Sequence, residues 1–143
     1  MIDTITKLFQ KTESESLYQV IGEEQGVYHL VKNFYHVMET DPTAKDCLGT
    51  HELIEGKVPD EVKKKLFMFL CGWFGGPNLF VETYGHPRMK ARHVHVKISE
   101  KEASQWLYCM NSSLDSHTVK VKPKYKKMLK NNFWALATRI KNI

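Results

Sequence analysis

Apolar residues recur every three or four positions along most of the chain, which is the period of an amphipathic helix. The first long stripe covers residues 27–38. A short apolar stretch at 17–21 precedes it, and the turn-forming residues 40–42 end it. The segment 43–57 has no clear period, so we expect only a short turn of helix there.

The next apolar stripe covers residues 62–74. Pro59 just before it is suited to the first turn of a helix, and Gly75, Gly76 and Pro77 stop the pattern. We expect a loop from Asn78 to about Pro87.

Two further stripes occupy the second half of the chain. The stripe at 103–114 follows Ser99 and Glu102, whose spacing is that of a capping box. The last stripe runs at helical spacing from Tyr125 to Ile143. These patterns predict an all-α protein.

The length and composition are those of one globular domain. The chain has 143 residues, of which 42% are hydrophobic and 26% charged. No apolar run approaches the roughly 18 residues of a membrane span, and residues 1–16 have no apolar block of the kind found in signal peptides.

The three cysteines are an odd number without a C-x-x-C pair. This pattern argues against a disulfide framework or a zinc ribbon, and we expect a cytoplasmic protein.

The positive charge is concentrated near the C-terminus. The formal net charge is +5, and residues 120–143 contain eight basic residues and no acidic one. We interpret them as the solvated face of the last helix. Nucleic-acid binding through this segment is a third-ranked hypothesis, because no helix-turn-helix or base-reading pattern accompanies it.

Two histidines stand two positions apart in the segment RMKARHVHV. On a helix His93 and His95 would face roughly opposite directions, whereas on a strand both could reach one metal ion. A zinc site would need two more ligands, and no cysteine is close in sequence. The spacing alone therefore assigns neither histidine a role.

Several motifs occur in an order that resembles one protein family. They are W-F-G-G-P at 73–77, G-H-P-R-M-K-A-R-H at 85–93 and Q-W-L-Y-C-M at 105–110, with Phe34-Tyr35 upstream. This combination is similar to the group II truncated haemoglobins over about residues 17–141. The resemblance implies a two-over-two helical sandwich that holds a non-covalent b-type haem. Residues 1–16 would then be an N-terminal extension, and 17–143 the truncated globin domain.

The resemblance also implies roles for individual residues. His93 matches the proximal histidine that binds the haem iron, and Arg92 matches the base that pairs with a haem propionate. Tyr35 and Trp106 match the distal residues that hydrogen-bond the bound gas. His51 is the candidate for a further distal polar residue, with Leu48 as the alternative.

Apolar residues that would line a haem slot are spread over several predicted helices. Val62 stands where many globins place a distal histidine. The candidate lining residues are Phe34, Val62, Leu66, Phe69, Leu70, Phe74, Leu79, Phe80, Met89, Val96, Ile98 and Met110, and the candidate bases for the propionates are Arg88, Lys90 and Arg92. An ordinary core with solvated bases would explain most of the apolar positions equally well. It accounts poorly for the set Tyr35, His93 and Trp106.

The resemblance implies a protein that binds dioxygen, with nitric oxide, carbon monoxide or peroxide as related ligands, and that stores, senses or transports oxygen. The alternative is a redox enzyme on the same haem, either a nitric oxide dioxygenase or a peroxidase-like enzyme. It would need an external reductase, because the chain has no G-x-G-x-x-G fingerprint. Whether the protein is an enzyme stays open at this point. We expect a monomer or a weak homodimer.

Overall fold

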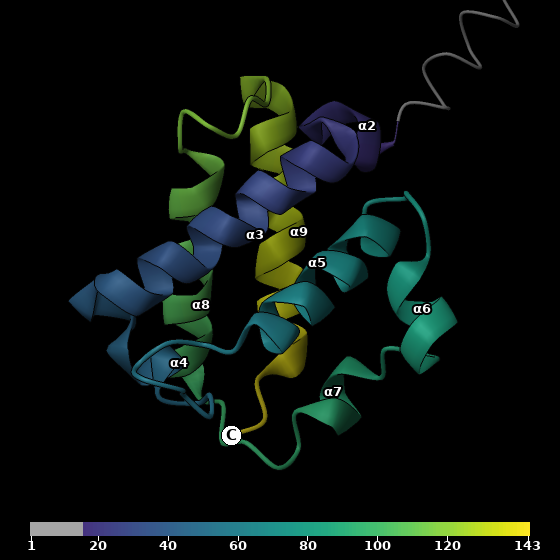
Figure 1. Ribbon diagram of the computed structural model, residues 1–143. Helices are drawn as coiled ribbons and strands as arrows, with labels where there is room; N and C mark the ends of the chain where they lie inside the picture. The colour runs from purple at the N-terminus through teal and green to yellow at the C-terminus, as the bar shows by residue number, and fades with distance from the viewer. Residues whose placement is uncertain (1–15) are drawn as a thin grey trace, which may run out of the picture.

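The computed structural model describes residues 16–143, and these fold into helices joined by loops (Figure 1). The helices are α2 (Leu17–Ile21), α3 (Glu23–Thr40), the 3-10 helix η1 (Pro42–Ala44), α4 (Lys45–Leu48), α5 (Asp60–Trp73), α6 (Leu79–Tyr84), α7 (Met89–Arg92), α8 (Glu100–Leu114) and α9 (Pro123–Ile140). The described part of the chain contains no strand, only an isolated bridge between Ile54 and Lys57. The predicted all-α class is confirmed. No described helix is long and apolar enough to span a membrane.

Two pairs of long helices make up the body of the fold. Helices α3 and α5 pack together, as do α8 and α9, and the first pair crosses the second in Figure 1. Side chains from all four helices meet between the pairs. Phe34, Leu70, Met110 and Phe133 are nearly inaccessible to solvent, and fully burying each one contributes roughly 1.5–3 kcal/mol. The arrangement is the expected two-over-two sandwich.

The ends of the helices follow the expected local signals in part. The backbone N–H of Ser99 donates to the Glu102 carboxylate at 2.8 Å, as the predicted capping box requires. Ser16 and Gln19 form a similar box at the start of α2. Ser16 is the only part of the expected extension 1–16 that lies within the described residues.

The expectation of a loop at 78–87 was wrong, because α6 lies inside it. Phe80 of α6 is buried, and its ring lies 5.0 Å from the ring of Tyr84 one turn later. Turn-forming residues at both ends of this short helix hide its period in the sequence.

The last apolar stripe also ends earlier than expected. Helix α9 stops at Ile140, and Ile143 is exposed.

Helices α2 and α3 approach each other too closely for a side chain at Gly26. A Cβ at Gly26 would lie 1.8 Å from the carbonyl oxygen of Ile21. We therefore expect Gly26→Ala to lower the free energy of unfolding by roughly 1–3 kcal/mol, the usual cost of overpacking. Gly49→Ala is the control, since its nearest contacts are at 3.4 Å. Urea unfolding of both variants measures the difference. Equal stability of the two variants would show that α2 and α3 can move apart at position 26 without a measurable loss of stability.

Candidate functional site

A large cavity lies between the helix pairs and is closed on two sides by shorter segments. Its volume is about 1590 Å³, above the roughly 300–1,000 Å³ of most small-molecule sites. Most of the residues that the sequence analysis proposed for a site line it. They are Phe34, Tyr35, His51, Val62, Leu66, Phe69, Phe80, Met89, Arg92, His93, Val96, Ile98 and Trp106.

Tyr35 lines the cavity from the C-terminal half of α3. Its side chain is buried, and its ring packs edge-on against Phe34 at 4.9 Å and against His51 at 6.3 Å. Within residues 16–143 its hydroxyl has no hydrogen-bond partner from the protein. Burial raises the pKa of Tyr35 above its ordinary value. The phenol therefore stays protonated and is a hydrogen-bond donor available to a ligand.

His51 lies near Tyr35, on the segment that follows α4. Its Nδ1 is 3.1 Å from the carbonyl oxygen of Cys47 and 3.3 Å from that of Leu48. Because both oxygens are acceptors, Nδ1 carries the proton and Nε2 is left unprotonated. Burial lowers the pKa of His51 below its ordinary value. The alternative residue, Leu48, packs against the core and does not line the cavity.

His93 follows the last residue of α7 and is half-buried in the cavity wall. Its Nδ1 lies 2.5 Å from the carbonyl oxygen of Met89 and donates to it. This bond fixes the tautomer, so that the lone pair is on Nε2. A metal-ligating histidine usually has this arrangement. His95 also borders the cavity but is exposed. The segment is not a strand, so the strand arrangement that could have brought both histidines to one metal ion is absent.

Trp106 reaches the cavity from α8. Its ring lies 5.4 Å from that of Phe34 and 5.8 Å from that of Phe133, with edge-on geometry in both contacts. These contacts fix the indole in the core of the sandwich. Its N–H has no hydrogen-bond partner among the described residues. Trp106 and Tyr35 therefore bring two polar donors to a mostly apolar space.

Gln105, the neighbour of Trp106, ties α4 to α8. Its Oε1 accepts the backbone N–H of Cys47 at 2.8 Å, and its Nε2 donates to Asp46 at 2.8 Å. This hydrogen bond is the main reason why the pKa of Asp46 lies below its ordinary value. Since His51 is bonded to carbonyl groups of α4, Gln105 links its position to that of Trp106.

The basic residues around the cavity differ in part from those expected. The guanidinium of Arg92 donates to the carbonyl oxygens of Tyr84 and His86 at 3.1 and 3.2 Å and lies over the ring of Phe80. Arg88 and Lys90 do not line the cavity. Three lysines that the sequence analysis did not identify do so: Lys45, Lys65 and Lys97. No local pattern distinguishes these lysines from those on solvated faces.

Four of the proposed lining residues lie outside the cavity wall. Leu70, Phe74 and Met110 are buried in the core, and Leu79 packs against it. Phe74, which directly follows α5, contacts Phe133 at 5.8 Å, so the C-terminal end of α5 lies against α9. Other apolar residues take their place in the wall, namely Cys47, Ala103, Leu136 and Ile140. Ala103 was detectable, since it lies one helical turn before Trp106.

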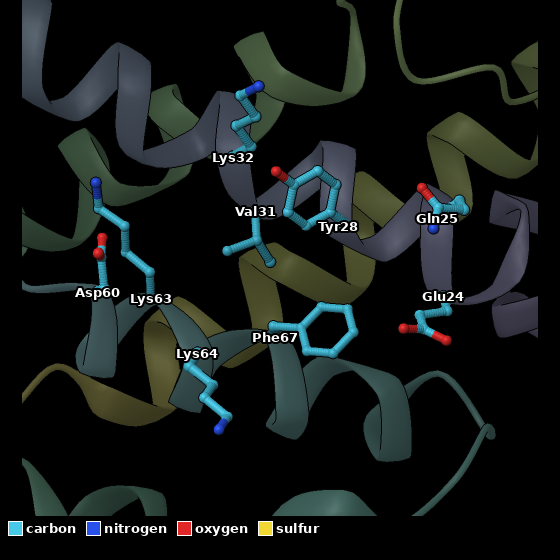
Figure 2. Close-up of a pocket in the computed structure, with 9 residues that line it drawn as sticks. All are labelled: Glu24, Gln25, Tyr28, Val31, Lys32, Asp60, Lys63, Lys64 and Phe67. Atoms are coloured by element: carbon cyan, nitrogen blue, oxygen red, sulfur yellow. The ribbon is translucent and has the colours of Figure 1, made fainter.

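A second hollow of about 540 Å³ lies between α3 and α5 on the outside of the sandwich. Figure 2 shows Tyr28, Val31 and Phe67 close together, with charged side chains around them. The residues that line it are Glu24, Gln25, Tyr28, Val31, Lys32, Asp60, Lys63, Lys64 and Phe67. None is a histidine or a cysteine, so this hollow lacks the imidazole and thiol groups that line the larger cavity.

The larger cavity offers single metal ligands rather than a cluster of them. In the described part of the chain no group of three or more His, Cys, Asp or Glu residues could hold a metal ion. A metal would therefore need most of its ligands from another source, as in a porphyrin.

The three cysteines are buried free thiols. Burial raises the pKa of Cys47 and Cys109 to about 12 and that of Cys71 to about 11. Because only the thiolate reacts, at pH 8 we expect labelling by a disulfide reagent about a hundredfold or more slower than in urea-unfolded protein. Rapid labelling of Cys47 in the folded protein would show that the cavity wall opens on that timescale.

The chain is similar to proteins of one family. The family model for bacterial-like globins matches residues 16–142. The group 2 truncated hemoglobin YjbI of Bacillus subtilis is 34% identical over 98 residues, which are 68% of each chain. A cold-adapted truncated hemoglobin from the Antarctic bacterium Pseudoalteromonas haloplanktis has a similar structure, with a TM-score of 0.83 and 36% identity. The match covers 90% of this chain and 99% of that one.

A second solved structure supports the same assignment. It is the group II 2-on-2 hemoglobin of Agrobacterium tumefaciens, with a TM-score of 0.81 and 30% identity over 90% of this chain and 95% of that one. The crossed helix pairs of this chain agree with the 2-on-2 arrangement of that protein. The chain therefore belongs to the bacterial-like globin family and is a group II truncated haemoglobin, which places it among haem proteins that bind small gases.

Proposed function

We propose that this protein binds dioxygen and other diatomic gases at a non-covalent b-type haem, with His93 as the iron ligand. The observation that carries the proposal is the bond from His93 Nδ1 to the carbonyl oxygen of Met89, which leaves an unprotonated Nε2 in the wall of a large cavity. A single neutral imidazole such as His93 would hold the haem iron and leave it free to bind a gas.

The residues of the cavity fit such a group. The volume is sufficient, and Leu66, Phe69 and Val96 provide apolar walls. Arg92 and the three lysines provide cations for carboxylate groups. Haem iron supplies reversible coordination of a diatomic gas when it is bound. The side chains of the protein would hold the haem, orient it and shield it from water.

Two hydrogen-bond donors would act on the gas. The Tyr35 hydroxyl and the Trp106 indole N–H have no protein partner within residues 16–143 and line the same cavity. A hydrogen bond to a partly charged ligand is stronger in a dry pocket than in water. We therefore propose that these residues retain dioxygen, with His51 as a neutral imidazole beside Tyr35.

Slow release of dioxygen would favour the redox alternative over oxygen transport, since a carrier must let go of its ligand. Nitric oxide oxidation or peroxide reduction would use the same cavity residues and would require electrons from a separate reductase. The rate of oxygen dissociation therefore decides between the two functions. A fast rate supports delivery or sensing, and a slow rate supports chemistry.

His93→Ala should abolish stable haem uptake, whereas His95→Ala should leave it nearly unchanged, because only His93 has its ring tautomer fixed by Met89. The measurement is the visible spectrum of each purified variant with added haem, first ferric, then reduced, then with carbon monoxide. Added imidazole should restore the spectrum of His93→Ala. Equal behaviour of the two variants would refute the choice of ligand. Lack of specific haem uptake by the unaltered protein would refute the proposed function.

Tyr35→Phe and Trp106→Leu should each speed oxygen dissociation about five- to tenfold, the effect of losing one hydrogen bond. Stopped-flow replacement of oxygen by carbon monoxide measures the rate. Tyr28→Phe and Trp134→Leu are matched controls, since both residues are exposed and lie outside the cavity wall. Unchanged rates in both cavity variants would exclude distal hydrogen bonding as the cause of oxygen retention.

A further inference from the structure

The segment that carries His93 has little apolar burial of its own. Helix α7 has four residues and no buried side chain. From Val94 to Lys97 the residues are exposed or half-buried, and only Ile98 is buried. An isolated helix of this length is unstable in water. The position of His93 must therefore depend on contacts with another part of the chain.

Asn142, which follows α9, makes those contacts. Its side-chain Nδ2 donates to the carbonyl oxygens of His93 at 3.1 Å and Val96 at 2.7 Å. Its Oδ1 accepts the backbone N–H of Ile98 at 2.9 Å. The backbone N–H of Asn142 donates to the carbonyl oxygen of Ile98, also at 2.9 Å. One amide side chain thus bonds the backbone at three points of the segment 93–98.

Asn142 is itself held by a rigid element. Ala137 near the end of α9 is fully buried in a small cluster with Ile98 and Ala103, and Ile140 is also buried. Figure 1 shows the end of the chain beside the segment between α7 and α8. The amide therefore transmits the position of α9 to the backbone of His93.

We propose that Asn142 is a positioning residue for the iron ligand, a role that rests on the proposed function. Asn142 fixes the backbone carbonyl of His93, while Met89 fixes its ring through Nδ1. With both ends of the residue held, Nε2 has one direction and one depth in the cavity wall. Ligand-orienting partners of this kind commonly affect metal affinity 10–100-fold.

The test compares Asn142→Ala with Asn33→Ala in the full chain. Asn33 is a matched control because its Nδ2 also joins distant segments, donating to Thr118 at 2.5 Å and to Ser116 at 3.3 Å. Haem loss from the ferric protein is measured by transfer to excess apomyoglobin. The iron–histidine stretching band is measured in the reduced protein.

Asn142→Ala should lose haem about tenfold faster, with a shifted or broadened iron–histidine band. Asn33→Ala should match the unaltered protein in its rate of haem loss and in its iron–histidine band. This should hold even if Asn33→Ala and Asn142→Ala lower the thermal stability equally. Asn142→Asp keeps the acceptor for Ile98 but loses the two donors. It should therefore lose haem like Asn142→Ala while the Ile98 amide stays protected.

Hydrogen exchange of the haem-free protein gives a readout independent of loading. The Ile98 amide should exchange faster in Asn142→Ala than in the unaltered protein or in Asn33→Ala. An unchanged exchange rate would show that the Asn142 side chain does not hold the segment 93–98, and would overturn the proposal. Normal haem uptake with the same haem loss and the same band in all variants would overturn the positioning role and leave the proposed function standing. Failure of the unaltered protein to take up haem would overturn both.

Discussion

The contact between Trp106 and Phe133 is the interaction on which the rest of the structure depends. It joins α8 to α9, and further ring contacts extend it to α3 through Phe34 and to α5 through Trp73, which contacts Phe133. Large aromatic side chains contribute much of the buried area of a small core. A cluster that touches all four long helices therefore fixes how the two pairs cross, and with that the shape of the cavity beside them.

Tyr35 and Gln105, which act at the candidate site, are direct sequence neighbours of residues in this cluster. Tyr35 follows Phe34, and Gln105 precedes Trp106, while Trp106 itself both packs in the core and borders the cavity. Successive helical residues point about 100° apart. A core contact at one position therefore turns its neighbour toward the edge of the core, where a polar group can meet a ligand.

The shorter segments of the cavity wall bury few side chains and are held in addition by polar side chains of the long helices and of the C-terminus. Gln105 holds α4, and Asn142 holds the segment after α7. Glu39 of α3 accepts the backbone N–H of Val58 at 2.9 Å and pairs with Lys63 at 3.1 Å. One hydrogen bond contributes only about 0.5–1.5 kcal/mol. Only a few hydrogen bonds fix the position of each segment, so replacing one side chain is enough to change it.

The sequence by itself determined the long helices, through the spacing of their apolar residues, and the cap formed by Ser99 and Glu102. It also determined which side chains are available to a site. Repeated spacing and the Ser99–Glu102 pair are local signals, which is why α3, α5, α8 and α9 could be predicted. The tertiary structure alone decided that His51 rather than Leu48 reaches the cavity, that three unforeseen lysines border it, and that Leu70 and Met110 face the core instead. It also decided that residues 79–84 form a helix. These outcomes depend on contacts between residues far apart in the chain, and periodicity carries no information about the partner that a helix face will meet.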